Sequence, residues 1–180
     1  MIDKTIDLFV EKINASDQEP LYEYEIPVFL RSDVQNELQQ YYWQIKSKNL
    51  IDSAKSFQNK LSIKLPESFF SLISRYAFPC FEVTSIFFFA NTDEDTIWEL
   101  SENTFADKFM SDFLIKKGFI QFGNPDNGSY DPICFDTRQG LKKDYAIIQI
   151  DHENIICNSK IVIVKEIATS FTEFVKKYLL

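Results

Sequence analysis

Acidic side chains in the stretch QFGNPDNGSYDPICFD (residues 121–136) are the first candidates for chemistry in this sequence. Three aspartates lie there at intervals of five residues: Asp126, Asp131 and Asp136. Converging carboxylates can hold the divalent metal ions of a hydrolase. Side chains alternate between the two faces of a strand, however, so Asp131 and Asp136 would point in opposite directions along a regular strand. A metal-dependent hydrolase using these three aspartates and Asp151 is therefore a remaining alternative, and we expect no metal or cofactor.

Nucleophilic catalysis finds little support in the sequence. No Gly-x-Ser-x-Gly motif occurs, and the single histidine, His152, lies between two acids. A pair formed by Cys134 and His152 is conceivable if neighbouring strands bring the two side chains together. No oxyanion-hole signature accompanies it. The sequence therefore predicts a protein that is not an enzyme and has no catalytic residues.

A structural interpretation accounts for the same acidic stretch. Asn127-Gly128 lies between two apolar runs, and an Asn-Gly pair at such a place favours a β-hairpin because both residues tolerate a positive φ. Aspartate side chains in such loops accept hydrogen bonds from nearby backbone N–H groups. Asp131, directly before Pro132, is well placed to anchor this loop.

The balance of charges narrows the class of partner. Twenty-seven acidic residues against 19 basic ones give a net charge of −8 and a pI near 4.7. Nucleic-acid phosphates would repel such a surface, whereas a basic protein would be attracted to it. The 18 Phe residues predict a large aromatic core, and only four Gly residues disfavour a glycine-rich phosphate loop.

Cysteines and apolar runs bear on the compartment. The three cysteines are far apart in the chain, which suggests reduced core thiols: Cys80, Cys134 and Cys157. The N-terminus lacks the long apolar run of a secretory signal. The longest apolar run, residues 86–90, is far shorter than the roughly 20 residues that span a bilayer. We expect a cytoplasmic protein that does not enter membranes.

The first 75 residues read as mainly helical. Apolar residues at helical spacing predict a helix over residues 1–13, and Ser32 can cap a second helix over 34–46. Residues 1–49 therefore form an N-terminal helical extension. Residues 50–61 predict another helix. Pro66 suits the first position of a helix whose buried face carries Phe69, Leu72, Ile73 and Tyr76.

Strand patterns dominate the second half of the chain. Six segments read as strands: residues 81–90, 96–100, 119–123, 131–136, 145–151 and 160–167. Ser170 and Glu173 fit a capping box that begins a C-terminal helix. Short connections between strands favour hairpins. The sequence thus predicts a single α+β domain over 1–180, with a mostly antiparallel sheet of about six strands packed against N-terminal helices and a C-terminal helix.

Four pieces of the sequence, in this order, resemble successive signatures of the SUKH superfamily. They are LPESFFSLI (65–73), KKGFIQFGNPDNGSYDPICFD (116–136), IIQIDHE (147–153) and IATSFTEFVKKYL (167–179). One departure is Tyr130, where the family usually has glycine. The resemblance implies that the matching motif residues build the scaffold: Leu65, Pro66, Gly123, Asp131, Pro132, Phe135, Asp136, Asp151, Ser170, Phe171 and Phe174.

The same resemblance implies a binding module. Bacterial members of the superfamily are typically immunity proteins that neutralise a cognate polymorphic toxin by binding it. A basic, nuclease-like toxin domain is then the expected partner. The alternative is a regulatory scaffold or adaptor, similar to the fungal cell-wall regulators of the superfamily. The sequence leaves the oligomeric state open.

Candidate contact residues come from the charge pattern. No Lys or Arg occurs between Tyr76 and Asp107. The acidic residues of this segment that we predict to contact a partner are Glu82, Asp93, Glu94, Asp95, Glu99 and Glu102. A second acidic segment holds Asp17, Glu19, Glu23 and Glu25. The competing interpretation is a solvated surface, for which charged runs are typical.

Overall fold

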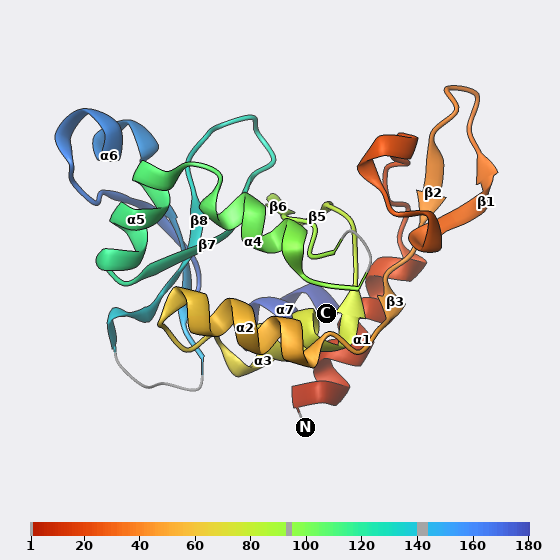
Figure 1. The fold of residues 1–180 in the computed structure, drawn as a ribbon, viewed down its shortest axis with the longest axis horizontal. Helices are drawn as coiled ribbons and strands as arrows, with labels where there is room; N and C mark the ends of the chain where they lie inside the picture. Colours follow the sequence, from red (N-terminus) through yellow and green to blue (C-terminus); the bar gives the residue numbers. More distant parts are fainter. Residues whose placement is uncertain (1, 93–94, 140–143) are drawn as a thin grey trace.

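An antiparallel sheet forms the centre of the molecule. The computed structural model describes residues 2–92, 95–139 and 144–180 (Figure 1). Within these residues, six strands pair in the order β10-β9-β8-β7-β6-β5. The strands are β5 (Phe81–Val83), β6 (Ile86–Phe88), β7 (Phe119–Pro125), β8 (Ile133–Asp136), β9 (Ala146–Ile150) and β10 (Ile163–Ala168). The predicted α+β class is confirmed.

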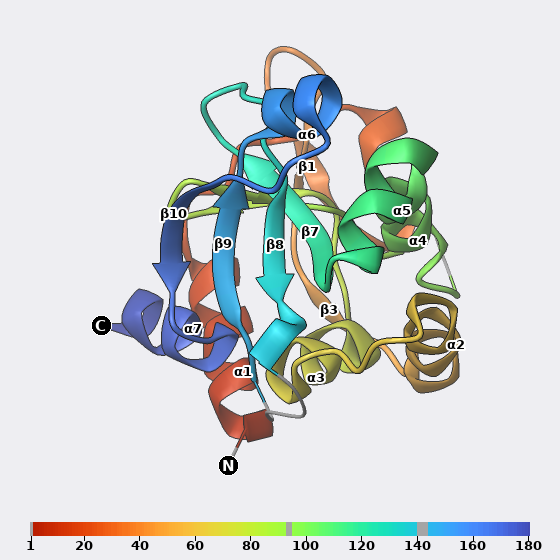
Figure 2. The same cartoon turned by 90° about the vertical axis from the view of Figure 1, so that its left-hand side faces the viewer.

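Helices cover both faces of this sheet. The main core packs one face against α1 (Ile2–Ala15), α2 (Ile51–Leu61), α3 (Glu67–Arg75) and α7 (Phe171–Leu179). A smaller core packs the other face against α5 (Lys108–Lys116) and α6 (His152–Asn158). Figure 2 shows α1 and α7 side by side beneath the strands. The C-terminal helix therefore closes the main core, as its apolar face predicts.

The central strands alternate between the two cores. On β8, Ile133 and Phe135 belong to the main core, whereas Cys134 belongs to the smaller one. Successive side chains of a strand point to opposite faces, so a strand covered on both sides reads as a nearly continuous apolar run, here residues 133–135. This is why the ICFD strand lacks the apolar–polar alternation of a half-exposed strand.

Phenylalanine fills the main core, as the composition predicts. Phe171 is fully buried, and its ring lies within 6.4 Å, between centroids, of six other phenylalanine rings. Those rings belong to Phe9, Phe69, Phe88, Phe122, Phe135 and Phe174. The first residue of α7 thus joins α1, α3 and three strands.

The helix predicted over residues 34–46 is wrong. The chain there forms a hairpin of β1 (Arg31–Gln35) and β2 (Tyr41–Trp43). The Asn36 side chain accepts hydrogen bonds from the backbone of Leu38 and Gln40, both at 3.0 Å, and so stabilises a turn in place of a helix. Leu38 is 66% exposed, so the apolar face of the predicted helix had no core to cover.

Within residues 1–49, α1 is therefore the only α-helix among the residues described, and it belongs to the main core. Short 3-10 turns at Glu23–Glu25 and Val28–Leu30 lead to the hairpin, and a small two-stranded sheet joins β3 (Lys46–Ser47) to β4 (Tyr76–Ala77). Trp43 is buried, and its ring lies 6.3 Å from that of Phe81. The hairpin projects beyond the sheet, at the end opposite α6 (Figure 1).

Two of the predicted strands are also corrected. Residues 81–90 form two strands, because Thr84 and Ser85 both have positive φ, 45° and 69°, and turn the chain as a hairpin. Residues 96–100 lead into α4 (Trp98–Phe105). Ile97 and Leu100 are buried three residues apart, which is helical spacing. The predicted number of strands is still right, because one predicted strand forms two and another forms the start of a helix.

Smaller features agree with the sequence to within a residue or two. Pro66 precedes the first residue of α3 as its N-cap, one position before the predicted one. Ser170 caps α7 by accepting the Glu173 N–H at 3.1 Å. Gly128, with φ +74°, turns the chain between β7 and β8. Of the three predicted core thiols, Cys157 is wrong because it is exposed on α6.

Candidate partner-binding surface

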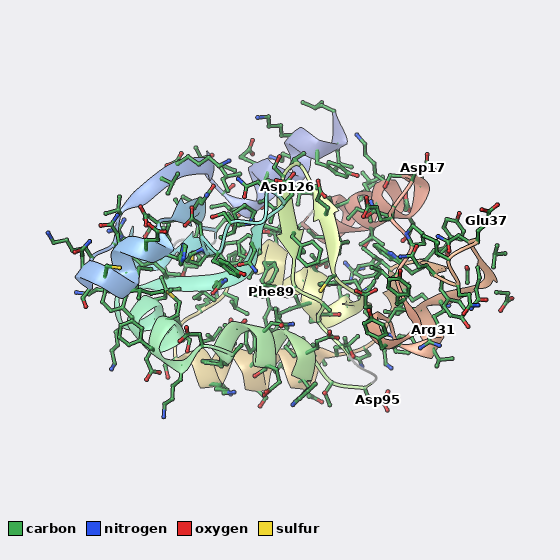
Figure 3. The ribbon with its side chains drawn as sticks, turned by 90° about the horizontal axis from the view of Figure 1, so that it is seen from above. Asp17, Arg31, Glu37, Phe89, Asp95 and Asp126 are labelled. Atoms are coloured by element: carbon green, nitrogen blue, oxygen red, sulfur yellow. The ribbon has the colours of Figure 1, made fainter. Side chains whose placement is uncertain are left out.

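A cleft of about 670 Å³ opens between the N-terminal segment and the start of α4. One wall comes from residues 24–31, and the other comes from Lys48 and residues 95–99. Figure 3 labels Arg31 and Asp95 from these two walls on the same side of the molecule. The lining residues are Tyr24, Glu25, Ile26, Pro27, Val28, Phe29, Arg31, Lys48, Asp95, Trp98 and Glu99.

Specific contacts hold the two walls in place. The Lys48 ammonium lies 2.8 Å from the Asp95 carboxylate and 4.3 Å from the centre of the Phe29 ring. The Arg31 Nε donates to the Ile26 carbonyl at 2.9 Å. Lys48 thus contacts Phe29, 19 residues before it, and Asp95, 47 residues after it, and so ties the two walls together.

Exposed apolar side chains line or border the cleft. Tyr24 is 84% exposed, Val28 74% and Trp98 55%. The Tyr22 and Tyr24 rings stack with 5.7 Å between their centres. Tyr and Trp are enriched in protein interfaces, where they supply large contact area at small entropic cost. We call this group, together with Glu25, Asp95 and Glu99, the cleft surface.

The cleft surface unites parts of the two acidic segments. Asp95 and Glu99 lie on one wall, and Glu25 of the other acidic segment lies opposite. Arg31 and Lys48 line the same cleft, so its charge is mixed: three carboxylates and two cations. The contact residues predicted from the two acidic segments did not include these two cations or the exposed aromatic residues. In the sequence these aromatic residues are only isolated apolar positions within polar segments, which is too weak a signal to predict a binding surface.

The other predicted contact residues are placed differently. Glu102 is exposed on α4, one turn beyond Glu99. Asp93 and Glu94 lie outside the described residues. Glu82 is exposed on β5; its pKa is raised by burial and by the nearby carboxylate of Asp126, with which it shares a hydrogen bond. Asp126 and Asp95 lie on opposite sides of the molecule (Figure 3), so the acids form two groups.

Three of the four aspartates first considered for catalysis, Asp131, Asp136 and Asp151, accept hydrogen bonds from backbone N–H groups. Asp131 accepts from the Gln149 side chain at 2.8 Å and from the His152 backbone N–H at 3.0 Å. Asp151 caps α6 through the Asn154 N–H at 2.9 Å. Asp136 pairs with the Arg138 guanidinium at 2.7 Å. Across residues 2–92, 95–139 and 144–180, no three acidic, His or Cys side chains are arranged to hold a metal ion.

The conceivable Cys134–His152 pair does not form. The His152 ring hydrogen-bonds to Asp131 at 3.1 Å, and Cys134 is fully buried in the smaller core. Burial raises the pKa of the Cys134 thiol well above its usual range, which keeps it in the unreactive protonated form.

Replacing Asp131 by asparagine should lower the free energy of unfolding at pH 7 by about 1–3 kcal/mol, because a half-buried charged acceptor of several hydrogen bonds is lost. Burial acts to raise the Asp131 pKa, but hydrogen bonds from His152, Gln149 and Ser129 lower it overall. Its stabilising contribution is therefore complete above the unfolded-state value of 3.8 and is lost as the pH falls through the lower folded value.

Urea titrations at pH 7 and at pH 3 would measure this difference. The gap between the native protein and Asp131→Asn should be clear at pH 7 and shrink at pH 3. Asp112→Asn, an exposed change on α5, is the control and should alter stability by less than about 0.5 kcal/mol. An equal gap at both pH values would contradict the assignment.

Asp144 is a structural aspartate that sequence reasoning missed. Its carboxylate accepts from the backbone N–H groups of Phe171 at 3.1 Å and Thr172 at 2.8 Å, and from the Ser68 hydroxyl at 3.3 Å. It therefore satisfies the first N–H groups of α7 from 27 residues away. No local motif marks such a long-range cap.

The residues predicted to build the scaffold lie mostly in the interior. Leu65, Phe135, Phe171 and Phe174 are at most 4% exposed. Gly123 sits on β7 where an added Cβ would come 2.5 Å from the Phe87 carbonyl oxygen, so only glycine fits without a shift. Pro132 and Asp136 are also buried.

Comparison with protein families gives one match. The family model described as SMI1 / KNR4 family (SUKH-1) matches residues 48–177, nearly three quarters of the chain. The matched span contains all six strands of the main sheet, the helices α2 to α6 and most of α7. A search of curated protein sequences gave no match. Within the described residues, no helix combines the length and apolarity needed to cross a membrane.

Proposed function

The chain belongs to the SMI1 / KNR4 family (SUKH-1), and from this premise we propose that it is a bacterial immunity-type protein. In this role it neutralises a cognate polymorphic toxin by direct protein–protein binding. It needs no cofactor and no catalytic step, since occupation of the toxin's surface is sufficient to inhibit it. The toxin domain is basic and nuclease-like.

The cleft surface is the observation that supports this role best. Exposed Tyr24 and Trp98 supply rigid aromatic anchors, and Glu25, Asp95 and Glu99 supply negative charge around them. Interfaces with a basic partner combine such anchors with complementary charge, which steers association. The net charge of −8 adds long-range attraction to the same partner.

Co-expression tests the proposal directly. The protein is produced together with the toxic domain encoded beside its gene, and survival and co-purification are scored. Rescue with a stoichiometric complex supports the immunity role. No rescue and no complex, from protein shown to be folded by circular dichroism, contradicts it. Several weak partners in place of one tight complex would favour the regulatory adaptor.

Charge reversal at the cleft should slow binding of the toxin domain. The double variant Asp95→Lys with Glu99→Lys is expected to lower the association rate constant about tenfold at low salt, because charges at an interface act mainly on the encounter rate. Stopped-flow or surface plasmon resonance measurements at two salt concentrations would show the change and its reduction by salt.

A matched control changes the net charge equally at a distance from the cleft. Asp112→Lys with Glu153→Lys reverses two exposed acids on α5 and α6 and should alter the rate less than threefold, through net charge alone. A third pair, Glu82→Lys with Glu102→Lys, tests the other predicted contacts. If only the third pair slows association, the binding surface includes Glu82 or Glu102 and is not centred on Asp95 and Glu99.

A further inference from the structure

A pocket of about 370 Å³ lies between the end of α5, the turn after β8 and the loop after α6. The helices α5 and α6 lie on the same face of the sheet (Figure 2). The residues that line this basic pocket are Lys117, Phe119, Arg138, Ser159, Lys160 and Ile161. Three of the six are cations and none is acidic, although the net charge of the chain is −8. The overall acidity of the protein therefore does not account for this pocket.

The Arg138 side chain is held in a fixed position in the basic pocket. Its Nε and Nη2 atoms donate to the two carboxylate oxygens of Asp136, at 2.9 and 2.7 Å. The guanidinium carbon lies 4.6 Å from the centre of the Phe119 ring. Gly118 leaves room for this arrangement, since an added Cβ there would come 2.9 Å from Arg138 Cγ. Among the described residues, Nη1 has no acceptor and is available to a ligand.

The two lysines of the pocket carry uncompensated charge. In the part of the chain that the structure describes, neither Lys117 nor Lys160 forms an ion pair. The Lys117 ammonium lies 5.9 Å from the centre of the Phe113 ring. The Lys160 backbone N–H donates to the Asn154 carbonyl at 3.2 Å, which holds this lysine at the end of α6. Like charges gathered in one pocket repel one another, and a bound anion relieves that repulsion.

The charge of the basic pocket fits a phosphate group better than a carboxylate. Hydrogen bonds from the Arg138 side chain lower the pKa of Asp136, so this carboxylate stays ionised at neutral pH and neutralises one cation. Three cations and one carboxylate leave two positive charges. A phosphate monoester carries about 1.5–2 negative charges at pH 7. Arginine binds phosphate oxygens through its planar fork, and lysine binds them as a point charge.

We propose that the basic pocket binds the phosphate group of a small phosphomonoester, with Lys117, Arg138 and Lys160 as its contacts. The Arg138 Nη1 donates to the phosphate, and the two ammonium groups neutralise it. The pocket is near the lower end of the roughly 300–1,000 Å³ that is typical of small-molecule sites, so it has room for a short organic group beside the phosphate. The backbone of a nucleic acid is not the ligand, because the net charge of −8 repels a polyanion.

This site goes beyond the proposed function and does not depend on it. The helix α6 lies at the end of the molecule opposite the β1–β2 hairpin (Figure 1). Residues 24–31, which line the cleft, lead directly into that hairpin. Variants of the basic pocket should therefore leave toxin rescue unchanged, so failure of one proposal is distinguishable from failure of the other.

An NMR titration of the full ¹⁵N-labelled chain with glycerol phosphate at pH 7.5 and low salt tests the proposal. The backbone amides of Gly118, Phe119, Arg138 and Ser159 should shift in a saturable manner, with a dissociation constant on the order of 1 mM because the cations are exposed. Acetate at the same ionic strength should bind about tenfold more weakly, because it carries one charge. Added salt should weaken the binding of glycerol phosphate.

Removing the two lysine charges should weaken binding without disturbing the fold. Lys117→Gln with Lys160→Gln is expected to raise the dissociation constant for glycerol phosphate about tenfold, since each exposed charge contributes a few-fold. The matched control, Lys4→Gln with Lys177→Gln, removes two exposed lysines on α1 and α7 and should change it less than about twofold. Circular dichroism and thermal melts check that both double variants fold like the native chain.

Arg138 stays unchanged in these variants, because its loss would leave the buried Asp136 carboxylate unpaired and would destabilise the fold. A titration that does not saturate by about 20 mM overturns the proposal, and so do shifts centred on residues outside the pocket. Equal affinity for acetate and glycerol phosphate contradicts the assignment to phosphate. A lysine double variant that binds like the native chain contradicts the assigned contacts.

Discussion

Replacing Phe171 by alanine is expected to lower the free energy of unfolding by about 3–5 kcal/mol. The Phe171 ring is fully buried and meets phenylalanine rings from α1, α3, the sheet and α7 itself. Removing it leaves a cavity at the point where these elements join, and the surrounding rings can close it only in part. Urea denaturation at pH 7, followed by fluorescence and by circular dichroism, measures the loss.

Two further variants show that the loss comes from the core. Phe109→Ala removes a phenylalanine that is 54% exposed on α5 and should cost less than about 1 kcal/mol. Phe171→Leu keeps most of the apolar volume and should fall between the two alanine variants. If Phe171→Ala destabilises no more than Phe109→Ala, the aromatic cluster is not the centre of the core.

Replacing Gly123 by alanine is expected to cost roughly 3 kcal/mol, the upper end for overpacking in a close contact. The new Cβ would lie 2.5 Å from the Phe87 carbonyl oxygen and 3.3 Å from a methyl carbon of Ile86. Gly123 pairs with Phe88 of β6 on one side and Ile133 of β8 on the other. The backbone of β6 must therefore move, and the β5–β6 hairpin would separate from the sheet.

Gly128 is the matched control because its requirement for glycine has a different cause. Nothing lies within 4 Å of a Cβ added there, but its φ is +74°. Gly128→Ala should cost about 1 kcal/mol, and Gly128→Asn should recover most of it because asparagine tolerates this conformation. Gly123→Asn should recover nothing. Thermal melts of the four variants would contradict this account if asparagine were tolerated equally at both positions.

Local signals were readable wherever the interacting groups are neighbours in the chain. The Ser170 cap, the Asn127-Gly128 turn and the start of α3 beside Pro66 all depend on groups within a few residues. The apolar runs 133–135 in β8 and 146–148 in β9 are equally direct, since strands buried on both faces read as nearly continuous apolar runs. The resemblance to the family was recognised from the same signals, taken in their order along the chain.

The spacing of apolar residues gave wrong predictions where those residues are not buried in the fold or where the run is short. Residues 34–46 have helical apolar spacing, yet Val34 and Leu38 are more than 60% exposed because the hairpin projects from the sheet. Residues 96–100 are too short an apolar run to distinguish a strand from the first turn of α4. In both segments the deciding contacts come from distant parts of the chain.

Composition and local patterns predict the class of fold, the family and the acidic character of the protein, because they depend on residue types and near neighbours in the chain. Which acids come together depends instead on packing between distant segments. Docking of Trp43 against Phe81 and the ion pair of Lys48 with Asp95 bring the N-terminal segment to α4. Glu25 and Asp95 thereby line the same cleft, while Glu82 lies with Asp126 elsewhere. A surface assembled from segments 70 residues apart depends on packing that no local pattern encodes.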